Sequence, residues 1–292
     1  MISPYVRRRR LAAELRALRE QDDCPADKLA EQIGVARQTI SRLENGHVAP
    51  DLHVVMKILR RFGVGEDRWQ QVMTIARDAR ERGWWATFAT QMGARQALYA
   101  DLEAGADAIR EYRLTMLPGL LQIPTYTEAR LYAGGDTHPG LDPTRVVEAR
   151  TCRQQMLECP GGPVYEVILD ELVVRRHAVP AHVAGPQLDH LVDLGHHHDN
   201  VTIRVLPVRA TITGVPRSAF SCYTYPDPGD PTVVAVDTIT SDLVLTTLDK
   251  PADVASYIDL YEHLRAAALS PADSLDLLAS LAEKHTQGGT TQ

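Results

Sequence analysis

The chain has 292 residues, a formal net charge of -7 and 44% hydrophobic residues. This length accommodates about two domains of roughly 150 residues each, and the composition excludes an intrinsically disordered protein. The charge is unevenly distributed: residues 1–82 carry 16 Lys+Arg and 12 Asp+Glu, whereas residues 83–292 carry 15 and 26, so nucleic-acid binding is expected of the basic first segment.

The cysteines indicate a reducing compartment, since they neither form CxxC motifs nor reach the density of a secreted disulfide scaffold. They are Cys24, Cys152, Cys159 and Cys222. The N-terminal stretch MISPYVRRRRLAAELRALRE carries charges where an export signal has its apolar segment. No stretch is long and apolar enough to span a membrane. We therefore expect a cytoplasmic protein that does not associate with membranes.

Apolar residues at helical spacing predict five short helices in the first 82 residues. Their inward-facing residues are Leu11, Leu15 and Leu18; Leu29, Ala30 and Ile33; Ile40 and Leu43; Leu52, Val55, Met56, Leu59 and Phe62; and Trp69, Val72, Met73 and Ala76. Arginines 7–10 precede the leucines of the first helix as a basic arm. Pro25 suits the start of the second helix.

The third helix lies in the stretch IGVARQTISRLENGHVAP, at residues 33–50. Gly34 supplies a tight turn before it, and Asn45-Gly46 supplies a left-handed end after it. Ile40 and Leu43 fall on its inward face. The outward-facing residues are Arg37, Gln38, Ser41 and Arg42. Because these side chains can pair with bases or phosphates, this helix is the candidate DNA-reading element.

A second domain is expected from residue 83, because the tryptophan pair Trp84-Trp85 follows the last short helix of the first segment and is expected to dock the first domain onto the second. Leu98, Leu102 and Ile109 outline one helix, and another runs from 142 to about 158. Short β-branched and aromatic runs then predict strands at 164–169, 201–206, 219–225, 232–236 and 243–248, with a helix at 182–194.

The chain closes with two helices, opened by Pro251 and by the capping signal Ser270-Pro271-Ala272-Asp273, and a disordered tail at 286–292. The predicted fold class is α+β. A five-helix domain at 1–82 is followed at 83–285 by a mixed α/β domain with a mainly antiparallel sheet.

The segment KLAEQIGVARQTISRLENG resembles the helix-turn-helix of the Cro/repressor, or xenobiotic response element, family. In such domains the third helix enters the major groove. The resemblance implies these base-reading positions: Arg37, Gln38, Arg42 and, nearer the backbone, Thr39. It implies these phosphate contacts: Ser41, Asn45, Lys28 and Arg10. A homodimer would place two such helices on a roughly palindromic double-stranded operator.

The same resemblance assigns a structural role to Arg19 and Glu44, which correspond to an internal salt bridge. The chain departs from the family pattern where the second helix begins, because Pro25-Ala26 replaces a glutamine that binds phosphate. The basic arm or Lys28 is expected to replace that contact.

The remainder, from RGWW through YRLTMLPGLLQIPTY, VILDELVVRR and NVTIRVLP to ALSPADS, resembles actinobacterial regulators in which this helix-turn-helix precedes a C-terminal domain of unknown function. That likeness covers nearly all of residues 83–281. It implies a transcription regulator, often encoded beside small partner proteins, and it names no ligand.

Several side chains also carry alternative interpretations. Trp84, Trp85, Tyr112 and Tyr126 could line a pocket for a hydrophobic effector, although core packing is the commoner role of such residues. Histidines 196–198 alternate in direction in an extended loop, so no metal site is expected there. Asp170-Glu171 fits a helix cap better than a catalytic pair, because no partner is spaced to complete a site.

The leading hypothesis is a sequence-specific transcription regulator whose acidic C-terminal domain mediates dimerisation and senses a ligand or a partner protein. The alternative is an antitoxin-like protein that sequesters a small neighbour-encoded protein and autoregulates its operon. No complete catalytic constellation, metal site or cofactor motif is present, so no enzyme activity and no cofactor are expected.

Overall fold

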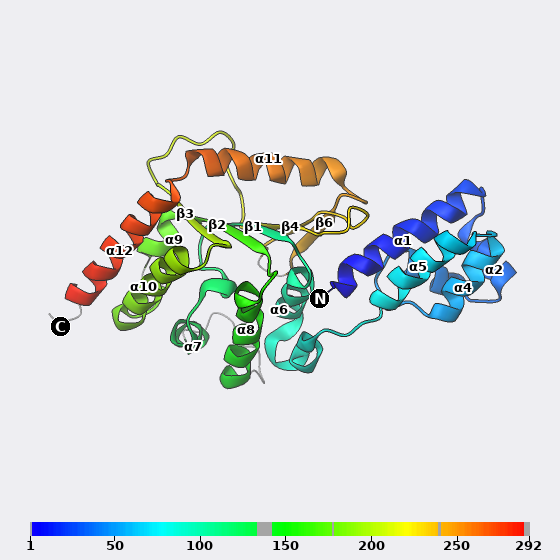
Figure 1. The fold of residues 1–292 in the computed structure, drawn as a ribbon, viewed down its shortest axis with the longest axis horizontal. Coiled ribbons are helices and arrows are strands. Elements are labelled where there is room, and N and C mark those ends of the chain that lie inside the picture. The colour runs from blue at the N-terminus through cyan, green and yellow to red at the C-terminus, as the bar shows by residue number, and fades with distance from the viewer. Residues whose placement is uncertain (1, 133–141, 177, 239–240, 289–292) are drawn as a thin grey trace.

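The computed structural model describes residues 2–132, 142–176, 178–238 and 241–288. A helical N-terminal unit is followed by a larger C-terminal unit, in which helices cover both faces of a six-stranded sheet (Figure 1). The predicted α+β fold class is therefore confirmed. No helix in these residues is long and apolar enough to cross a membrane.

The N-terminal unit contains the five helices expected from the sequence. They are α1 (Pro4–Gln21), α2 (Ala26–Ile33), α3 (Arg37–Glu44), α4 (Leu52–Arg61) and α5 (Glu66–Asp78). Their apolar faces meet in one core, where Leu29, Ile40, Val55, Leu59 and Val72 are fully buried. Each such side chain contributes about 1.5–3 kcal/mol by leaving water, so the predicted apolar spacing accounts for this unit.

Helix α1 is the longest of these five and packs in both units. Ser3 caps it by accepting a hydrogen bond from the backbone N–H of Val6 at 3.2 Å. Val6 lies in the core of the C-terminal unit, whereas Leu11 and Leu15 lie in the core of the N-terminal unit. The start of α1 is next to α6 (Ala89–Glu103), as Figure 1 shows. The spatial boundary between the units thus crosses α1.

The sheet is mixed, with the strand order β3-β2-β1-β4-β5-β6. Its strands are β1 (Ala108–Arg113), β2 (Val164–Asp170), β3 (Val201–Leu206), β4 (Phe220–Thr224), β5 (Val233–Val236) and β6 (Leu243–Thr246). The first three strands pair in parallel, while β4, β5 and β6 form an antiparallel meander that joins β1 through β4. The five strand runs predicted from the sequence correspond to β2 through β6.

Strand β1 corrects the prediction of a helix that included Ile109. Gly105 adopts φ 77, a left-handed conformation that ends the preceding helix. Leu98 and Leu102 therefore belong to α6, and Ile109 lies in a strand at the centre of the sheet. Charged residues within AIREYR conceal its strand character, because Glu111 and Arg113 pair with each other in the interior.

One face of the sheet is covered by α11 (Pro251–Ala267), against which Tyr112 and Phe220 are buried. The opposite face is covered by a layer of helices (Figure 1). Besides α6, these are α7 (Pro124–Tyr132), α8 (Pro143–Glu158), α10 (Ala181–His197) and α12 (Pro271–Gly288). The short helices η1 (Trp84–Thr87), η2 (Gly119–Leu121) and α9 (Glu171–Arg175) complete the unit.

The helix ends agree with most of the predicted caps. Asp170 accepts a hydrogen bond from the N–H of Leu172 at 2.9 Å, which confirms its capping role. Ser270 Oγ accepts from the N–H of Asp273 at 3.1 Å, as expected at the start of α12. Because α12 reaches Gly288, the first three residues of the tail predicted at 286–292 are helical; the other four lie outside the described residues.

Candidate nucleic-acid interface

Helix α3 is fixed by its apolar face and by tight contacts at its ends. Gly34 adopts φ 66, so the chain can turn out of α2 without the strain that a side chain would bring. Ile40 and Leu43 are buried in the core of the N-terminal unit. Beyond the end of the helix, a Cβ on Gly46 would lie 3.1 Å from the backbone oxygen of Arg8. Glycine therefore permits α1 to pack closely against this end of α3.

The four predicted base-reading residues lie on α3. Arg37, Gln38 and Arg42 are exposed, and Thr39 is half-buried. The side chain of Arg37 is 74% exposed and forms an ion pair with Asp27 of α2. Since such surface pairs contribute only about 0–1 kcal/mol, the guanidinium can exchange this partner for a base edge.

Three of the four predicted phosphate-contact residues are also exposed, namely Lys28 on α2, Ser41 on α3 and Asn45 just beyond α3. Asn45 Nδ2 donates to Ser41 Oγ at 3.4 Å, so these two side chains lie next to each other. Pro25 precedes α2 and makes no side-chain capping hydrogen bond. Lys28 places an exposed cation in the first part of α2, two residues after Ala26.

Arg10, the fourth of these residues, has partners that the sequence does not predict. Its Nη1 donates to Asp227 Oδ2 at 2.5 Å and to Asp230 Oδ1 at 3.1 Å, and its side chain is 16% exposed. The basic arm 7–10 lies within α1, in its first part. In this structure Arg10 is thus engaged by the C-terminal unit instead of lying free beside α3.

The internal salt bridge implied for Arg19 and Glu44 is confirmed. Arg19 Nε lies 2.7 Å from Glu44 Oε1, and Nη2 lies 3.0 Å from Oε2, so the pairing is bidentate. Arg19 Nη1 also donates to the backbone oxygen of Cys24 at 3.1 Å. The pair therefore joins α1, α3 and the turn before α2 while leaving the exposed face of α3 untouched.

Two further arginines support α3 and were missed from the sequence. Arg9 Nη1 donates to the backbone oxygen of Asn45 at 2.6 Å, and Arg16 Nη2 donates to that of Glu44 at 2.5 Å. The last carbonyls of a helix lack partners within the helix and favour cations. The spacing of seven residues places Arg9 and Arg16 on one face of α1. This spacing is the signal in the sequence that could have identified them as residues that support the end of α3.

The four residues predicted to line an effector pocket lie in three separate clusters. Trp84 and Trp85 pack with Phe88 and Met92, Tyr112 packs between the sheet and α11, and Tyr126 lies on the opposite side of the sheet. Tyr112 Oη also donates to Asp170 Oδ2 at 3.3 Å. The structure therefore does not bring these four side chains together.

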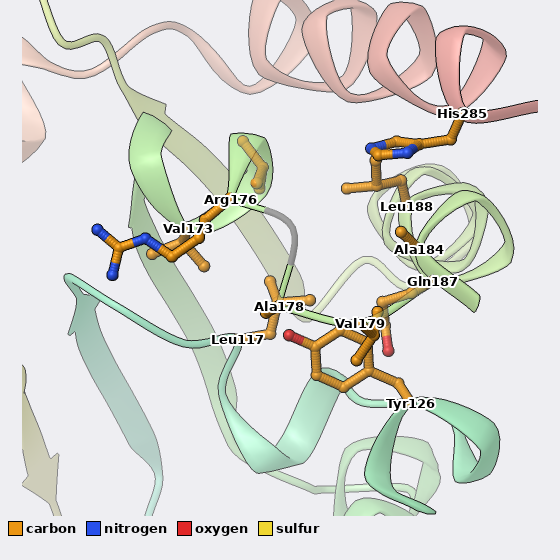
Figure 2. A pocket seen from close by; sticks show the side chains of 11 residues that line it. Leu117, Tyr126, Val173, Arg176, Ala178, Val179, Ala184, Gln187, Leu188 and His285 are labelled. Carbon is orange, nitrogen blue, oxygen red and sulfur yellow. The ribbon is translucent and has the colours of Figure 1, made fainter. Parts of the chain in front are cut away.

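Tyr126 lines a small pocket between α7, α9 and α10 (Figure 2). Its cavity volume is about 20 Å³, roughly the space of one water molecule. Figure 2 shows Tyr126 beneath Val179, and the guanidinium of Arg176 pointing away from Gln187 and Leu188. As it stands, the pocket has no room for an effector larger than water.

A larger cavity, of about 140 Å³, lies where the start of α1 meets the C-terminal unit. Ser3, Val6 and Arg7 line it on the α1 side, and Tyr225 and Asp227 line it on the other. Pockets of this kind, at the junction of two units, are common ligand sites. This one also borders the acidic residues that hold the basic arm.

A buried ionic network lies on the face of the sheet that α6 and α8 cover. Glu111 on β1 pairs with Arg113 and accepts a hydrogen bond from Tyr165, and Arg113 also pairs with Asp237. Nearby, the pair Glu103 and Arg153 joins α6 to α8, with side chains 4% and 6% exposed.

Burial raises the pKa of Glu103, while Arg153 acts in the opposite direction. Each charge named here therefore has a partner: Glu103 and Arg153 join α6 to α8, and Glu111, Arg113 and Asp237 pair at the sheet. The network presents no open site for substrate.

The histidine cluster does not form a metal site in the described part of the chain. His196 and His197 end α10, and His198 follows as its C-cap. The Nδ1 of His197 lies 2.9 Å from the backbone oxygen of Asp193. No group of three or more His, Cys, Asp or Glu side chains among the described residues is placed to hold a metal ion.

Comparisons with known proteins yield two family matches. Residues 96–280, more than half of the chain, match a domain of unknown function (DUF5753). Residues 15–69 match a helix-turn-helix, a span that runs from within α1 into α5 and includes all of α3. No curated protein and no solved structure matches the chain. The helix-turn-helix match indicates a DNA-binding transcription regulator, and the other match names no activity.

Proposed function

Because the chain belongs to the family defined by the domain of unknown function DUF5753 and carries an N-terminal helix-turn-helix, we propose that it binds a specific DNA operator. The observation that carries this proposal is the exposed polar face of α3, whose apolar face is locked into a core. Arg37 and Gln38 stand at its first turn, where helix-turn-helix proteins contact base edges. Arginine can pair bidentately with guanine, and glutamine with adenine.

The proposed active form is a homodimer. A single helix-turn-helix reads few base pairs, whereas two copies related by a twofold axis read two half-sites about one helical turn apart. The C-terminal unit would supply the dimer contact, and the operator would be roughly palindromic. Size-exclusion chromatography with light scattering of the full chain tests this point, and a monomer both free and on DNA would refute it.

The proposed role of the C-terminal unit is to sense a ligand or a partner protein. Its cavity of about 140 Å³ beside α1 favours a small effector, because a ligand there would touch both units. A second candidate is the antitoxin-like sequestration of a small protein. Its support is the edge strand β6, where Leu243 is exposed, with exposed Leu248 just beyond. Co-purification with the product of a neighbouring gene distinguishes the two.

The decisive experiment selects duplexes from a randomised pool with the full chain and measures fluorescence anisotropy on the selected and a scrambled duplex. Arg37→Ala and Gln38→Ala should each weaken binding to the selected duplex by about 1–3 kcal/mol. Binding to the scrambled duplex should change much less, because phosphate contacts dominate there.

The matched control is Arg60→Ala, which removes an exposed arginine from α4 instead of α3. It should reduce affinity for both duplexes by the same small factor. Equal binding of the unaltered chain to selected and scrambled DNA would refute sequence-specific recognition.

A further inference from the structure

The turn of α1 at residues 7–10 consists of four arginines, and each is paired with an acidic residue of the C-terminal unit. Arg7 and Arg10 share Asp227 and Asp230, which lie in the loop between β4 and β5. These four cations are contiguous in sequence, whereas their acidic partners come from different segments. The C-terminal unit thus presents an acidic surface that matches the basic turn.

Arg9 connects this surface directly to the candidate DNA interface. One of its terminal nitrogens, Nη1, donates to the backbone oxygen of Asn45 at 2.6 Å, and the other, Nη2, pairs with Asp249. Asp249 lies in the turn between β6 and α11. A carboxylate of the C-terminal unit is therefore held, through one side chain, beside a residue proposed to contact phosphate.

These pairs are suited to exchange with an anionic ligand. The side chains of Asp227 and Asp249 are 38% and 31% exposed, so opening either pair need not disrupt a core. The hydrogen bond from Arg10 holds the pKa of Asp227 below its usual value. Burial alone would raise the pKa of Asp249, but hydrogen bonds from Thr246 and Arg9 hold this pKa below its usual value. Both carboxylates therefore remain charged at neutral pH.

We propose that Asp227 and Asp249 act as an electrostatic brake on DNA binding, by holding Arg10 and Arg9 away from DNA phosphates. The brake rests on the proposed function, since it regulates the same interface. Phosphate oxygens compete with the two carboxylates for the same guanidinium groups, so DNA must displace them to gain these contacts. Any signal that moves the 226–231 loop or the 246–249 turn would then alter DNA affinity.

The first test compares Asp227→Asn/Asp249→Asn with Asp189→Asn/Asp259→Asn in the full chain, on the selected and the scrambled duplex. The control also converts two aspartates to asparagine, so it makes the same change in net charge. Asp189 on α10 and Asp259 on α11 are exposed, so these substitutions should not disturb a core.

Asp230 still pairs with Arg10 in the first variant, so at least the phosphate contact of Arg9 should be regained. The first variant should therefore bind both duplexes about three- to tenfold more tightly than the control. For this variant, the slope of the logarithm of the DNA-binding constant against the logarithm of the salt concentration should steepen by about 0.9 for each regained contact.

The second test is a double-mutant cycle between Arg9 and Asp249. Arg9→Gln should weaken DNA binding more in the Asp249→Asn background than in the unaltered chain, where Arg9 is already occupied. Circular dichroism checks folding of each variant. Asp249→Ser, which retains a hydrogen-bonding side chain without charge, replaces Asp249→Asn if that variant unfolds.

Two results would overturn the brake: equal affinity of Asp227→Asn/Asp249→Asn and its charge-matched control, or the same effect of Arg9→Gln in both backgrounds. The scrambled duplex separates this outcome from failure of the proposed function. If the unaltered chain shows no sequence preference, the proposed operator recognition is refuted. The effect of the two aspartates on affinity can still be measured in that case, because binding to the scrambled duplex depends on phosphate contacts alone.

Discussion

Arginine side chains of α1 hold the end of α3 without using any residue of its exposed face. Arg19 pairs with Glu44, while Arg9 and Arg16 donate to the backbone oxygens of Asn45 and Glu44. The residues that position α3 are therefore different from those proposed to read bases. Substitutions of the first kind should alter stability, and substitutions of the second kind should alter base preference.

Arg19→Ala tests this separation. It leaves the buried carboxylate of Glu44 without its bidentate partner, which should lower the free energy of unfolding by about 2–4 kcal/mol. Urea unfolding followed by circular dichroism measures the loss, and anisotropy on a panel of duplexes measures base preference.

The order of preference among duplexes should stay the same below the unfolding transition, because Arg37 and Gln38 are unaltered. Arg60→Ala, on the exposed face of α4, should change stability by less than about 0.5 kcal/mol. A comparable loss in both variants would mean that the Arg19 pair has no special structural role.

Local spacing predicts the inward positions of Ile40 and Leu43, and the family resemblance implies the pair of Arg19 with Glu44. Neither predicts the partners of Arg9 and Arg10, because Asp249 and Asp227 lie 240 and 217 residues away. A run of arginines before a helix-turn-helix suggests phosphate contact in any chain. Only the folded structure shows that acidic side chains occupy them here.

At the scale of secondary-structure elements, Glu166 on β2 joins two neighbours, β3 and α11. It accepts hydrogen bonds from Arg204 of β3 at 2.8 Å and from Arg265 of α11 at 2.9 Å. Burial alone would raise the pKa of Glu166, but these two arginines outweigh it and hold the pKa below the usual value. The carboxylate therefore favours the folded state when it is ionised.

Glu166→Gln should consequently reduce stability in a pH-dependent manner. The lowered pKa means that the contribution of Glu166 is fully present above the pKa of the unfolded chain, about 4.3, and is lost as the pH falls through the lower folded pKa. The difference in thermal stability between the unaltered chain and Glu166→Gln should be positive at pH 7 and shrink towards zero below about pH 3.

The control for this experiment is Glu148→Gln, which removes one partner of an exposed pair with Arg145 on α8. Such pairs contribute about 0–1 kcal/mol, so little pH dependence is expected. A difference for Glu166→Gln that is constant from pH 7 to pH 3 would contradict an ionic role.

Strand β1 shows why part of the C-terminal fold escapes sequence analysis. The other strands are runs of β-branched and aromatic residues between turn residues, and their positions were predicted to within a few residues. In β1, Glu111 and Arg113 face the side of the sheet that α6 and α8 cover, and they pair with each other there. Alternation of apolar and polar residues is a poor guide where buried charges replace apolar side chains.

At the scale of the whole molecule, α1 begins in the core of one unit and ends in the core of the other. Val6 and Leu11 mark the two cores, and no loop intervenes between them. The C-terminal unit holds the start of α1, and α1 packs directly against the end of α3. The C-terminal unit therefore determines where α3 is presented. A ligand or partner acting near the start of α1 would be coupled to the DNA interface through one rigid helix.

Asp101 is one of the residues that hold the start of α1 on the C-terminal unit. It accepts hydrogen bonds from Ser3 Oγ at 2.8 Å and from the N–H of Tyr5 at 2.9 Å, and it pairs with Arg8. Asp101→Ala should favour release of the start of α1, in which Val6 leaves the core of the C-terminal unit while the rest of both cores stays packed. Losing charged hydrogen bonds costs about 1.5–3 kcal/mol. The population of the state in which the start of α1 is detached from the C-terminal unit should therefore rise at least about tenfold.

Trypsin reports this detachment, because cleavage after arginines 7–10 requires that turn of α1 to leave the C-terminal unit and unwind. Limited proteolysis with mass spectrometry should show cleavage there at least about tenfold faster in Asp101→Ala, when opening is fast relative to cleavage. Asp189→Ala, an exposed change on α10, should leave the rate unaltered. Cleavage at the same rate in all three proteins would mean that Asp101 does not hold the two units together.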